Sequence, residues 1–507
     1  MNYKKILPVL TVIVALSCKK DHQEDFYVPE DPASFAEIGS IDIGNEGAAE
    51  ISAYDPKTGR LFVVYNAEDN NGVFLNRIDV IDLKDPSKPV KLTEIASSGY
   101  GGYVNSLSVK NGLLAAAIES KVKQEPGKVV IFNTSDNSLV KSVTVGVLPD
   151  MLTFSPDGRY ILSANEGEPN ADYTNDPVGS ISIIDVQNNY EVKTIDFSGF
   201  ESQKAALMQQ GLRVFGPNAT LAQDLEPEYI TVAEDSKTAW VTLQENNAIA
   251  TIDITAKTIK NIMPLGFKDY NVAANGVDVS DKDNVIEFKK WNVKSMYQPD
   301  AIAVLHKNGV PYLFTANEGD VREYAGFAEA KRVSALKLDP AAFPDALTLQ
   351  GQAMLGRLNV TTTLGDTDKD GDYDQLYSFG ARSFSVWDGN AGTLVFDSKN
   401  ELEVQAKAAA LYDDGRSDDK GVEPEGLALG EAGKKKLLFV GMERADAVAV
   451  YDVTNPTNPS FLQLLKTGDA PEGVMFIHAA DSPIKQSLLI VSSEGDGVVK
   501  IYKPNKL

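Results

Sequence analysis

Acidic side chains recur at two places in a repeated pattern along this 507-residue chain, and they have the clearest capacity for chemistry. One set opens a series of short apolar segments, and the other set closes the segment that follows. The openers are Glu50, Asn105, Asp150, Glu228, Asp300, Glu425 and Glu472, and the closers are Asn66, Glu119, Glu166, Glu245, Glu318, Glu443 and Glu494. Because the start of one antiparallel strand and the end of the next meet at the same sheet edge, we expect each opener beside its closer.

Carboxylates crowded in this way repel, so some of them must take up a proton, a cation or an arginine partner. Oxygen ligands in a chain with three histidines favour Ca²⁺ or Mg²⁺ over zinc. The expected metal ligands are Glu166, Glu318, Asp150 and Asp300. Both glutamates follow Asn and precede Gly, which lets the backbone turn tightly over an ion. The alternative is structural, with the acids accepting backbone N–H bonds from the adjacent repeat.

Three arginines lie just past such turns: Arg322, Arg382 and Arg444. They could neutralise neighbouring glutamates pairwise, or they could anchor an anion near a bound metal. With the second role, clustered Ca²⁺ would activate water for phosphoester hydrolysis. A lactonase-like reaction would use the same residues. The chain has no G-x-S-x-G turn and no catalytic cysteine pattern, so a binding or scaffold function is the first expectation and a hydrolase the alternative.

Residues 366–374 carry an alternating run of aspartates. Asp366, Asp368, Asp370, Asp372 and Asp374 surround Gly371 in the sixth position, as in the first half of an EF-hand-type loop. Position twelve holds Tyr377 in place of a bidentate Glu, and flanking helices are not evident. We therefore expect a stand-alone calcium loop, the alternative being a solvated acidic loop. The acidic cluster at 412–419 is expected to be an exposed turn.

The elements that position these residues repeat about every 40 to 50 residues, which is typical of propeller blades. We predict an all-β fold, a β-propeller of seven blades over residues 36–507. Residues 333–338 are expected as the third strand of the fifth blade, and residues 377–388 could form a degenerate eighth blade. The strand near 36–43 would close the last blade and protect both sheet edges. Insertions are expected at about 198–225 and 339–422.

The first residues resemble a lipoprotein export signal. Lys4 and Lys5 precede a short apolar run, and Cys18, the only cysteine, follows Ala-Leu-Ser. We expect a signal peptide over 1–17, lipidation of Cys18 and a tether over 18–35. The protein would then be anchored in the cell envelope at the outer membrane, facing either the surface or the periplasm.

The charge balance restricts the partners. A formal net charge of −24 and an isoelectric point near 4.6 argue against nucleic acid and against anionic lipid. Contact with the membrane is therefore expected through the lipid anchor alone. The remaining partners are a surface ligand or a small phosphoester, and we expect a monomer.

Taken together, the motifs resemble the choice-of-anchor I domain family, which includes proteins similar to mesenchyme-specific cell surface glycoprotein. The resemblance rests on residues 163–168, 226–229, 315–320, 366–374, 377–388 and 423–426. The resemblance implies an exported protein of a family whose members are anchored in different ways, which is consistent with a lipid anchor here. Some relatives are described as alkaline phosphatase-like through kinship with calcium-dependent propeller phosphatases, which is an analogy at the level of fold. The family offers no settled catalytic residues to transfer.

Overall fold

The computed structural model describes residues 27–44, 47–67 and 73–507. Seven four-stranded antiparallel sheets account for most of the strands. The expected signal peptide and Cys18 lie outside the described residues. Within these ranges no helix is both long and apolar enough to cross a bilayer.

The first three blades follow one another without interruption. Blade 1 consists of β2 (Ala48–Asp55), β3 (Arg60–Tyr65), β4 (Arg77–Asp82) and β5 (Val90–Ala96). Blade 2 consists of β6 (Val104–Lys110), β7 (Leu113–Ile118), β8 (Pro126–Asn133) and β9 (Leu139–Val147). Blade 3 consists of β10 (Pro149–Phe154), β11 (Tyr160–Asn165), β12 (Ser180–Asp185) and β13 (Glu191–Asp196).

The other four blades are separated by longer connections. Blade 4 consists of β14 (Pro227–Val232), β15 (Thr238–Leu243), β16 (Ala248–Asp253) and β17 (Thr258–Pro264). Blade 5 consists of β20 (Ile302–Lys307), β21 (Val310–Asn317), β27 (Ser383–Asp388) and β28 (Thr393–Asp397). Blade 6 consists of β29 (Pro424–Ala432), β30 (Lys435–Met442), β31 (Ala447–Asp452) and β32 (Ser460–Lys466). Blade 7 consists of β33 (Pro471–Ile477), β34 (Leu488–Ser493), β35 (Val498–Lys503) and β1 (Ala36–Asp42).

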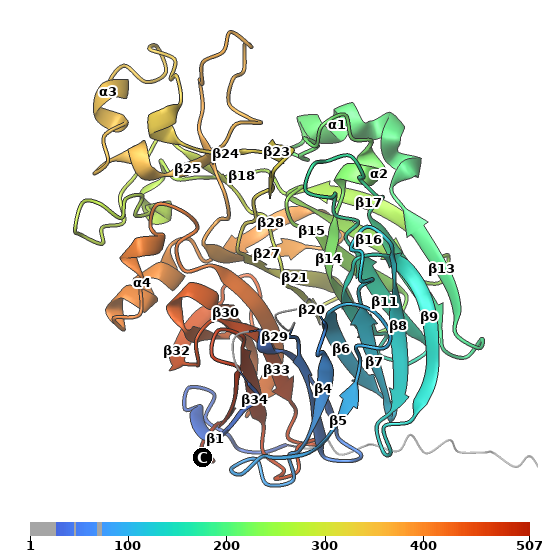
Figure 1. Ribbon diagram of the computed structural model, residues 1–507. Coiled ribbons are helices and arrows are strands. Elements are labelled where there is room, and N and C mark those ends of the chain that lie inside the picture. Colours follow the sequence, from blue (N-terminus) through green and yellow to red (C-terminus); the bar gives the residue numbers. More distant parts are fainter. Residues whose placement is uncertain (1–26, 45–46, 68–72) are drawn as a thin grey trace, which may run out of the picture.

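The sheets form a closed propeller. The first strands contact one another in the order β2, β6, β10, β14, β20, β29 and β33, and β33 contacts β2 again. Figure 1 shows the inner strands β6, β14, β20, β29 and β33 around a common centre. The N-terminal strand β1 pairs antiparallel with β35, from Ala36 opposite Lys503 to Asp42 opposite Val498. The prediction of seven blades closed by the N-terminal strand is therefore confirmed.

The hydrophobic core lies between neighbouring blades. Second strands are covered on both faces, and every residue of β11 and β34 is buried. Packing of two twisted sheets face to face explains why these strands read as short runs of apolar and small residues. One apolar cluster, for example, joins Leu162 and Ile183 of blade 3 to Val241 and Ile252 of blade 4.

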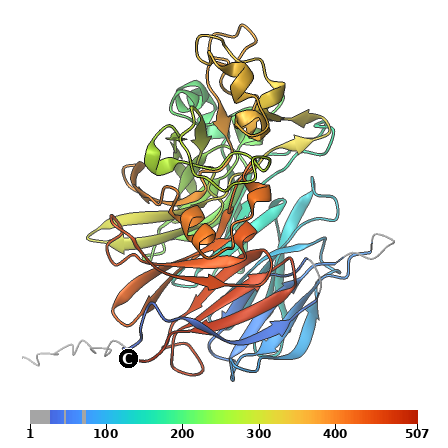
Figure 2. The ribbon, with the colours of Figure 1, turned by 90° about the vertical axis from the view of Figure 1, so that its left-hand side faces the viewer.

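Excursions from the blades gather at one end of the molecule (Figures 1 and 2). After blade 3 come η1 (Ser198–Gln203), α1 (Lys204–Gln209) and α2 (Leu221–Asp224). After blade 4 come β18 (Phe267–Asp269), η2 (Ala273–Asn275) and β19 (Lys294–Met296). Between β21 and β27 lie β22 (Glu323–Tyr324), β23 (Phe327–Ala328), β24 (Ala330–Arg332), η3 (Val333–Ala335), α3 (Ala346–Leu349), η4 (Leu355–Arg357), β25 (Asn359–Thr361) and β26 (Tyr377–Ser378). The remaining short helices are α4 (Glu401–Ala408), η5 (Asp414–Arg416) and η6 (Glu443–Ala445).

Blade 5 differs from the expectation. Residues 333–338 are not its third strand, because they begin with η3 and pack in the apolar core of the excursion beside Tyr270 and Leu358. The third strand is β27, which pairs with β21 from Tyr312 opposite Asp388. Residues 383–388 therefore form the third strand of blade 5, residues 377–378 pair with β19 in a separate small sheet, and the eighth-blade alternative is wrong.

The segment before β1 is attached to the propeller. Glu30 is buried and accepts hydrogen bonds from the N–H and the hydroxyl of Ser487, at 2.9 and 2.8 Å. Phe35 packs edge-on against Phe439 with ring centroids 5.2 Å apart. The described part of the expected tether, residues 27–35, thus packs on the folded domain.

Candidate cation site at the channel mouth

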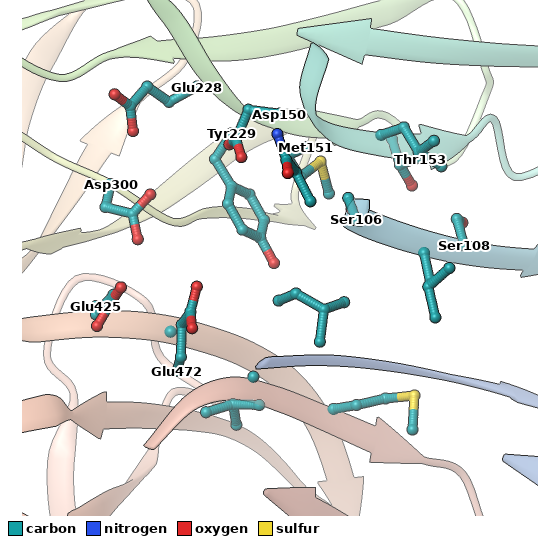
Figure 3. Close-up of a pocket in the computed structure, with 18 of the residues that line it drawn as sticks. Ser106, Ser108, Asp150, Met151, Thr153, Glu228, Tyr229, Asp300, Glu425 and Glu472 are labelled. Carbon is teal, nitrogen blue, oxygen red and sulfur yellow. The ribbon is translucent and has the colours of Figure 1, made fainter. Parts of the chain in front are cut away.

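The central channel contains a cavity of about 550 Å³ lined by the first strands of the blades. Five openers of successive blades contribute carboxylates to it: Asp150, Glu228, Asp300, Glu425 and Glu472. Figure 3 shows several of these carboxyl groups directed toward one open space, into which the Tyr229 ring projects. We call the acidic end of this cavity the channel mouth.

A local backbone feature aims the openers at the channel. In blades 3, 4 and 6 the register shifts just after the proline that starts the first strand, and the acid follows that proline. Blade 7 has the same shift between Pro471 and Gly473, around Glu472. A bulge of this kind re-aims a side chain and interrupts regular pairing, which explains why an acid here faces the channel.

The closers meet the openers as expected from the hairpin geometry. In blade 1 the Asn66 side chain donates to Glu50 Oε2 at 2.8 Å. Glu166 and Glu318, the closers of blades 3 and 5, line the cavity together with Asp150 and Asp300. All four ring residues that the sequence predicted as metal ligands therefore line one cavity, and two of them, Asp300 and Glu318, belong to a group with metal-ligand spacing.

Negative charge in the cavity exceeds the positive charge around it. Eight carboxylates line it: Asp150, Glu166, Glu228, Asp300, Glu318, Asp320, Glu425 and Glu472. Among the described residues of this lining there is no Lys, Arg or His. Lys420 contacts Glu318 from outside this lining, and the charge that it does not balance must be balanced by bound protons or by a cation from solution.

The pKa values of the ring carboxyls reflect this imbalance. Burial raises the pKa of Asp150 to about 7, and repulsion from Glu168 adds to it. Burial, followed by repulsion from Glu494, raises the pKa of Glu50 to about 8. Burial, followed by repulsion from neighbouring carboxylates, also raises the pKa values of four further openers well above the usual range: Glu228, Asp300, Glu425 and Glu472.

Two groups of oxygens at the mouth have spacings that suit a metal ion. Carboxylate oxygens of Asp300, Glu318 and Glu425 lie within 4.8 Å of one another, and Glu425 Oε2 is buried without a hydrogen-bond partner. The second group joins Glu318 to Glu423 and Glu443. An all-carboxylate set fits a hard cation such as Ca²⁺.

Lys420 lies between members of the second group. Its Nζ is 2.6 Å from Glu318 Oε1 and 3.1 Å from Glu423 Oε2. The ammonium therefore offsets part of the charge of the second group, whereas the group of Asp300, Glu318 and Glu425, which shares Glu318, opens on the cavity. Lys420 was not anticipated from the sequence. Glu423 could have been, because Glu-Pro-Glu occurs at both 226–228 and 423–425.

Arg322 and Arg382 are occupied by the protein itself. Arg322 is 2% exposed and pairs with Asp224 and, at 2.9 Å, with Glu226. Arg382 is 1% exposed, pairs with Glu403 at 3.2 Å, and donates to main-chain carbonyls. Neither guanidinium reaches the cavity, so the predicted anion-anchoring role does not fit these two residues. Pairwise neutralisation of acids, the other interpretation, does fit them.

Arg444 is the exposed arginine of the three. Its side chain is 43% exposed and lies 2.8 Å from Glu443, at the rim of the second group. A surface pair of this kind contributes little to stability and leaves the guanidinium accessible. Among the predicted anion anchors, only Arg444 is placed where an external anion could contact it.

The aspartate loop has the local geometry of a cation loop. Oxygens of Asp366, Asp368 and Asp374 lie within 4.8 Å of one another, and Gly371, at a φ of +91°, donates its N–H to Asp366 at 3.2 Å. A second group joins Asp372 and Asp374 to Asp339, with Lys337 2.9 Å from Asp372. Asp370 belongs to neither group and accepts the N–H of Asp372 at 3.1 Å. The structure thus brings together four of the five predicted loop ligands, divided between two groups that share Asp374.

The arrangement defines a class: a seven-bladed propeller with an acidic channel mouth and an excursion that carries an aspartate loop. The chain matches the choice-of-anchor I domain over residues 50–456 and belongs to that family.

Two named relatives are similar to parts of the chain. Gigasin-3a of Magallana gigas is 30% identical over 31% of this chain and 66% of its own length. The mesenchyme-specific cell surface glycoprotein of Strongylocentrotus purpuratus is 26% identical over 55% of this chain and 43% of its own length. The chain thus spans 66% and 43% of the lengths of these two relatives.

Two solved structures resemble the chain at low identity. Kuenenia stuttgartiensis hydrazine synthase superposes with a TM-score of 0.49 and 13% identity, over 92% of this chain and 98% of that one. The Cps50 (Swd1) β-propeller domain of Myceliophteria thermophila gives 0.47 and 9% identity, over 93% and 100%.

Proposed function

We propose that this protein is a binding or scaffold protein of the cell surface whose channel mouth holds Ca²⁺ and, through it, an external ligand. The observation that supports this most is the cavity with eight carboxylates and no basic residue in its described lining. The family assignment and a relative described as a cell surface glycoprotein support the location.

The first ion would be held by Asp300, Glu318 and Glu425. Ca²⁺ takes about six to eight oxygen ligands, so three carboxylates leave coordination positions open toward the cavity. A ligand that offers carboxylate, phosphate or hydroxyl oxygens would complete the shell. Ser106, Ser108 and Thr153 further along the channel supply hydroxyl groups for orientation.

A second ion would be held by the aspartate loop, mainly through Asp366, Asp368 and Asp374. This loop lies in the excursion and does not line the cavity. Its ion would stiffen the excursion without contacting the ligand.

Calcium titration of the chelator-treated protein by calorimetry tests this function. The Asp300→Asn/Glu425→Gln variant should lose the mouth ion, with affinity lowered at least about 100-fold, because first-shell ligands are removed. Asp366→Asn/Asp368→Asn is the matched control and should lose only the loop ion. Unchanged binding in the first variant would refute the mouth site.

A metal-dependent phosphoesterase is the second candidate, favoured by the two oxygen groups that share Glu318. Two adjacent cations can stabilise the attacking and leaving oxygens of a phosphoryl group. Lys420 already occupies the second group, which favours binding over catalysis. Calcium-dependent hydrolysis of a chromogenic phosphomonoester or lactone, lost in Asp300→Asn/Glu425→Gln, would establish the enzyme. No turnover would leave the binding function.

The membrane attachment is a further part of the proposal. Cys18 would carry the lipid, and residues 19–26 would link it to the packed segment at 27–35. Cys18→Ala should move the protein from the membrane fraction to the soluble fraction, or leave it unprocessed. An unchanged membrane fraction would exclude lipidation of Cys18.

A further inference from the structure

Two glutamates at the edge of blade 4 are buried in direct contact without adequate partners. Glu226 is 1% exposed and Glu245 is 4% exposed. Their carboxyl groups lie within hydrogen-bond distance of each other. Both carboxyl oxygens of Glu226 and Oε2 of Glu245 lack a hydrogen-bond partner. Unsatisfied buried carboxylate oxygens are costly and require an explanation.

Neighbouring segments fix this pair in place. Asn246, which follows Glu245, accepts the N–H of Glu226 at 3.1 Å. The Asn246 amide donates to the carbonyls of Asp224 at 2.7 Å and Arg213 at 3.1 Å. These hydrogen bonds fix the backbone at Glu226 beside Asn246, the residue that follows Glu245.

The surrounding cations do not balance the charge. Arg322 lies 2.9 Å from Glu226, outside hydrogen-bond geometry, and it also pairs with Asp224. Arg213 is not available, because it pairs with Glu329.

Glu168, beside the Tyr324 hydroxyl, adds a further carboxylate and has Lys123 at 3.9 Å. Four carboxylates therefore face two cationic side chains: Glu168, Asp224, Glu226 and Glu245 against Lys123 and Arg322. Two negative charges remain.

One shared proton would satisfy a single contact between Glu226 and Glu245 and leave the other oxygens unpartnered. A divalent cation would engage three oxygens at once and neutralise the two remaining charges. We propose that Glu226 and Glu245, with their unpartnered buried oxygens, form a divalent-cation site of the Ca²⁺ type at the edge of blade 4 that faces blade 3, and that Glu168 contributes only its charge.

This site is separate from the channel mouth. Glu226 and Glu245 do not line the cavity, although Glu166, which does, is a near neighbour of both. The ion would bridge the residue before β14 to the turn after β15, beside the excursion that carries Arg322. Its role would be to hold these two ends of blade 4 together.

Calcium stoichiometry of the purified full chain, measured by native mass spectrometry after chelation and calcium addition, tests the proposal. Glu226→Gln/Glu245→Gln should bind one ion fewer than the wild type. Asp300→Asn/Glu425→Gln should keep this ion and lose the mouth ion, so failure of either site is seen separately. Equal stoichiometry in the wild type and Glu226→Gln/Glu245→Gln would overturn the proposal.

A milder variant covers the case in which the double variant does not fold. Glu245→Gln leaves the Arg322–Glu226 contact intact and should weaken one calcium-binding step at least about tenfold in calorimetry. Glu94→Gln, an exposed glutamate on β5, is the matched control and should leave all steps unchanged. Identical titration curves for Glu245→Gln and Glu94→Gln would equally overturn the site.

Discussion

The channel mouth and the aspartate loop use the same side chains in opposite surroundings. At the mouth, carboxylates from different blades converge in a cavity, and burial raises the pKa of Asp150 to about 7. In the loop, the carboxylates come from one short exposed segment. Hydrogen bonds from the hydroxyl and N–H of Thr367 lower the pKa of Asp374.

The difference shows how the same chemistry can serve two purposes. The loop satisfies the Asp374 carboxylate locally through Thr367, while Asp366 Oδ1 is buried without a hydrogen-bond partner. At the mouth, burial and repulsion favour the protonated form of the carboxylates, so a bound cation would favour their charged form. The mouth should therefore dominate the response of stability to pH and calcium.

The largest predicted effect is the pH dependence of the chelator-treated protein. The pKa values of Glu50 and Asp150 are raised to about 8 and about 7 in the folded state, from 4.5 and 3.8. Between pH 4 and 8 the folded state then binds more protons than the unfolded state, so stability falls as pH rises.

We expect the free energy of unfolding to decrease by at least about 3 kcal/mol from pH 5 to pH 8. Chemical denaturation of metal-free protein measures it. Calcium should flatten the dependence, and Asp300→Asn/Glu425→Gln should reduce it without calcium. A metal-free protein that is as stable at pH 8 as at pH 5 would contradict the account of the mouth.

A pair of glycine substitutions compares the two regions next. Gly319 and Gly371 both have a φ of +91°, so alanine meets the same backbone strain at each. A Cβ on Gly319 would lie 2.3 Å from the backbone nitrogen of Gly380, whereas at Gly371 the space is open. We expect losses of about 3 kcal/mol for Gly319→Ala and about 1 kcal/mol for Gly371→Ala, by denaturant titration. Equal losses would mean that the turn after Glu318 can relax.

Lys420→Met should have a moderate effect that depends on calcium. The substitution leaves Glu318 and Glu423 without their ammonium partner, at a cost of about 2 kcal/mol in metal-free protein. Added calcium should recover much of this loss by entering the group of Glu318, Glu423 and Glu443. Denaturation with and without calcium measures both effects, and a loss that calcium does not change would argue against a second ion there.

The smallest effect is expected in the loop. Thr367→Val removes the hydroxyl that donates to Asp374, while the backbone N–H remains. Calcium affinity of the loop should change by less than about threefold, since one of two neutral donors to a single ligand is lost. The affinity is measured by calorimetry in the Asp300→Asn/Glu425→Gln background. A change in calcium affinity above tenfold would show that calcium binding by the loop depends strongly on the Thr367 hydroxyl.

The repeated local pattern of the sequence predicted those features of the fold that depend on strands adjacent in the chain. Seven openers and seven closers, six of each acidic, indicated the blade count and the edge at which the acids meet, because hairpin geometry follows from adjacent strands. The third strand of blade 5 was missed, because a long excursion separates β21 from β27 and residues 333–338 have the apolar content of a strand. Their burial against Tyr270 and Leu358 is a tertiary effect.

The partners in the ion pairs could not be predicted from the sequence, because they too are set by tertiary packing. Arg322 meets Asp224 across 98 residues, and Arg213 meets Glu329 across 116. Sequence periodicity does not predict contacts between distant segments. The contact between Glu226 and Glu245, and their lack of hydrogen-bond partners, could therefore not be inferred from the sequence. The aspartate loop, by contrast, was recognisable because its ligands lie within nine consecutive residues.

The most direct measurement of the central claim is anomalous scattering from crystals of the protein grown with calcium. The account predicts an anomalous peak between the carboxylates of Asp300, Glu318 and Glu425, at the mouth of the cavity. Absence of any peak in the channel, with one present in the aspartate loop, would contradict the cation-binding mouth and leave calcium as a structural ion of the excursion.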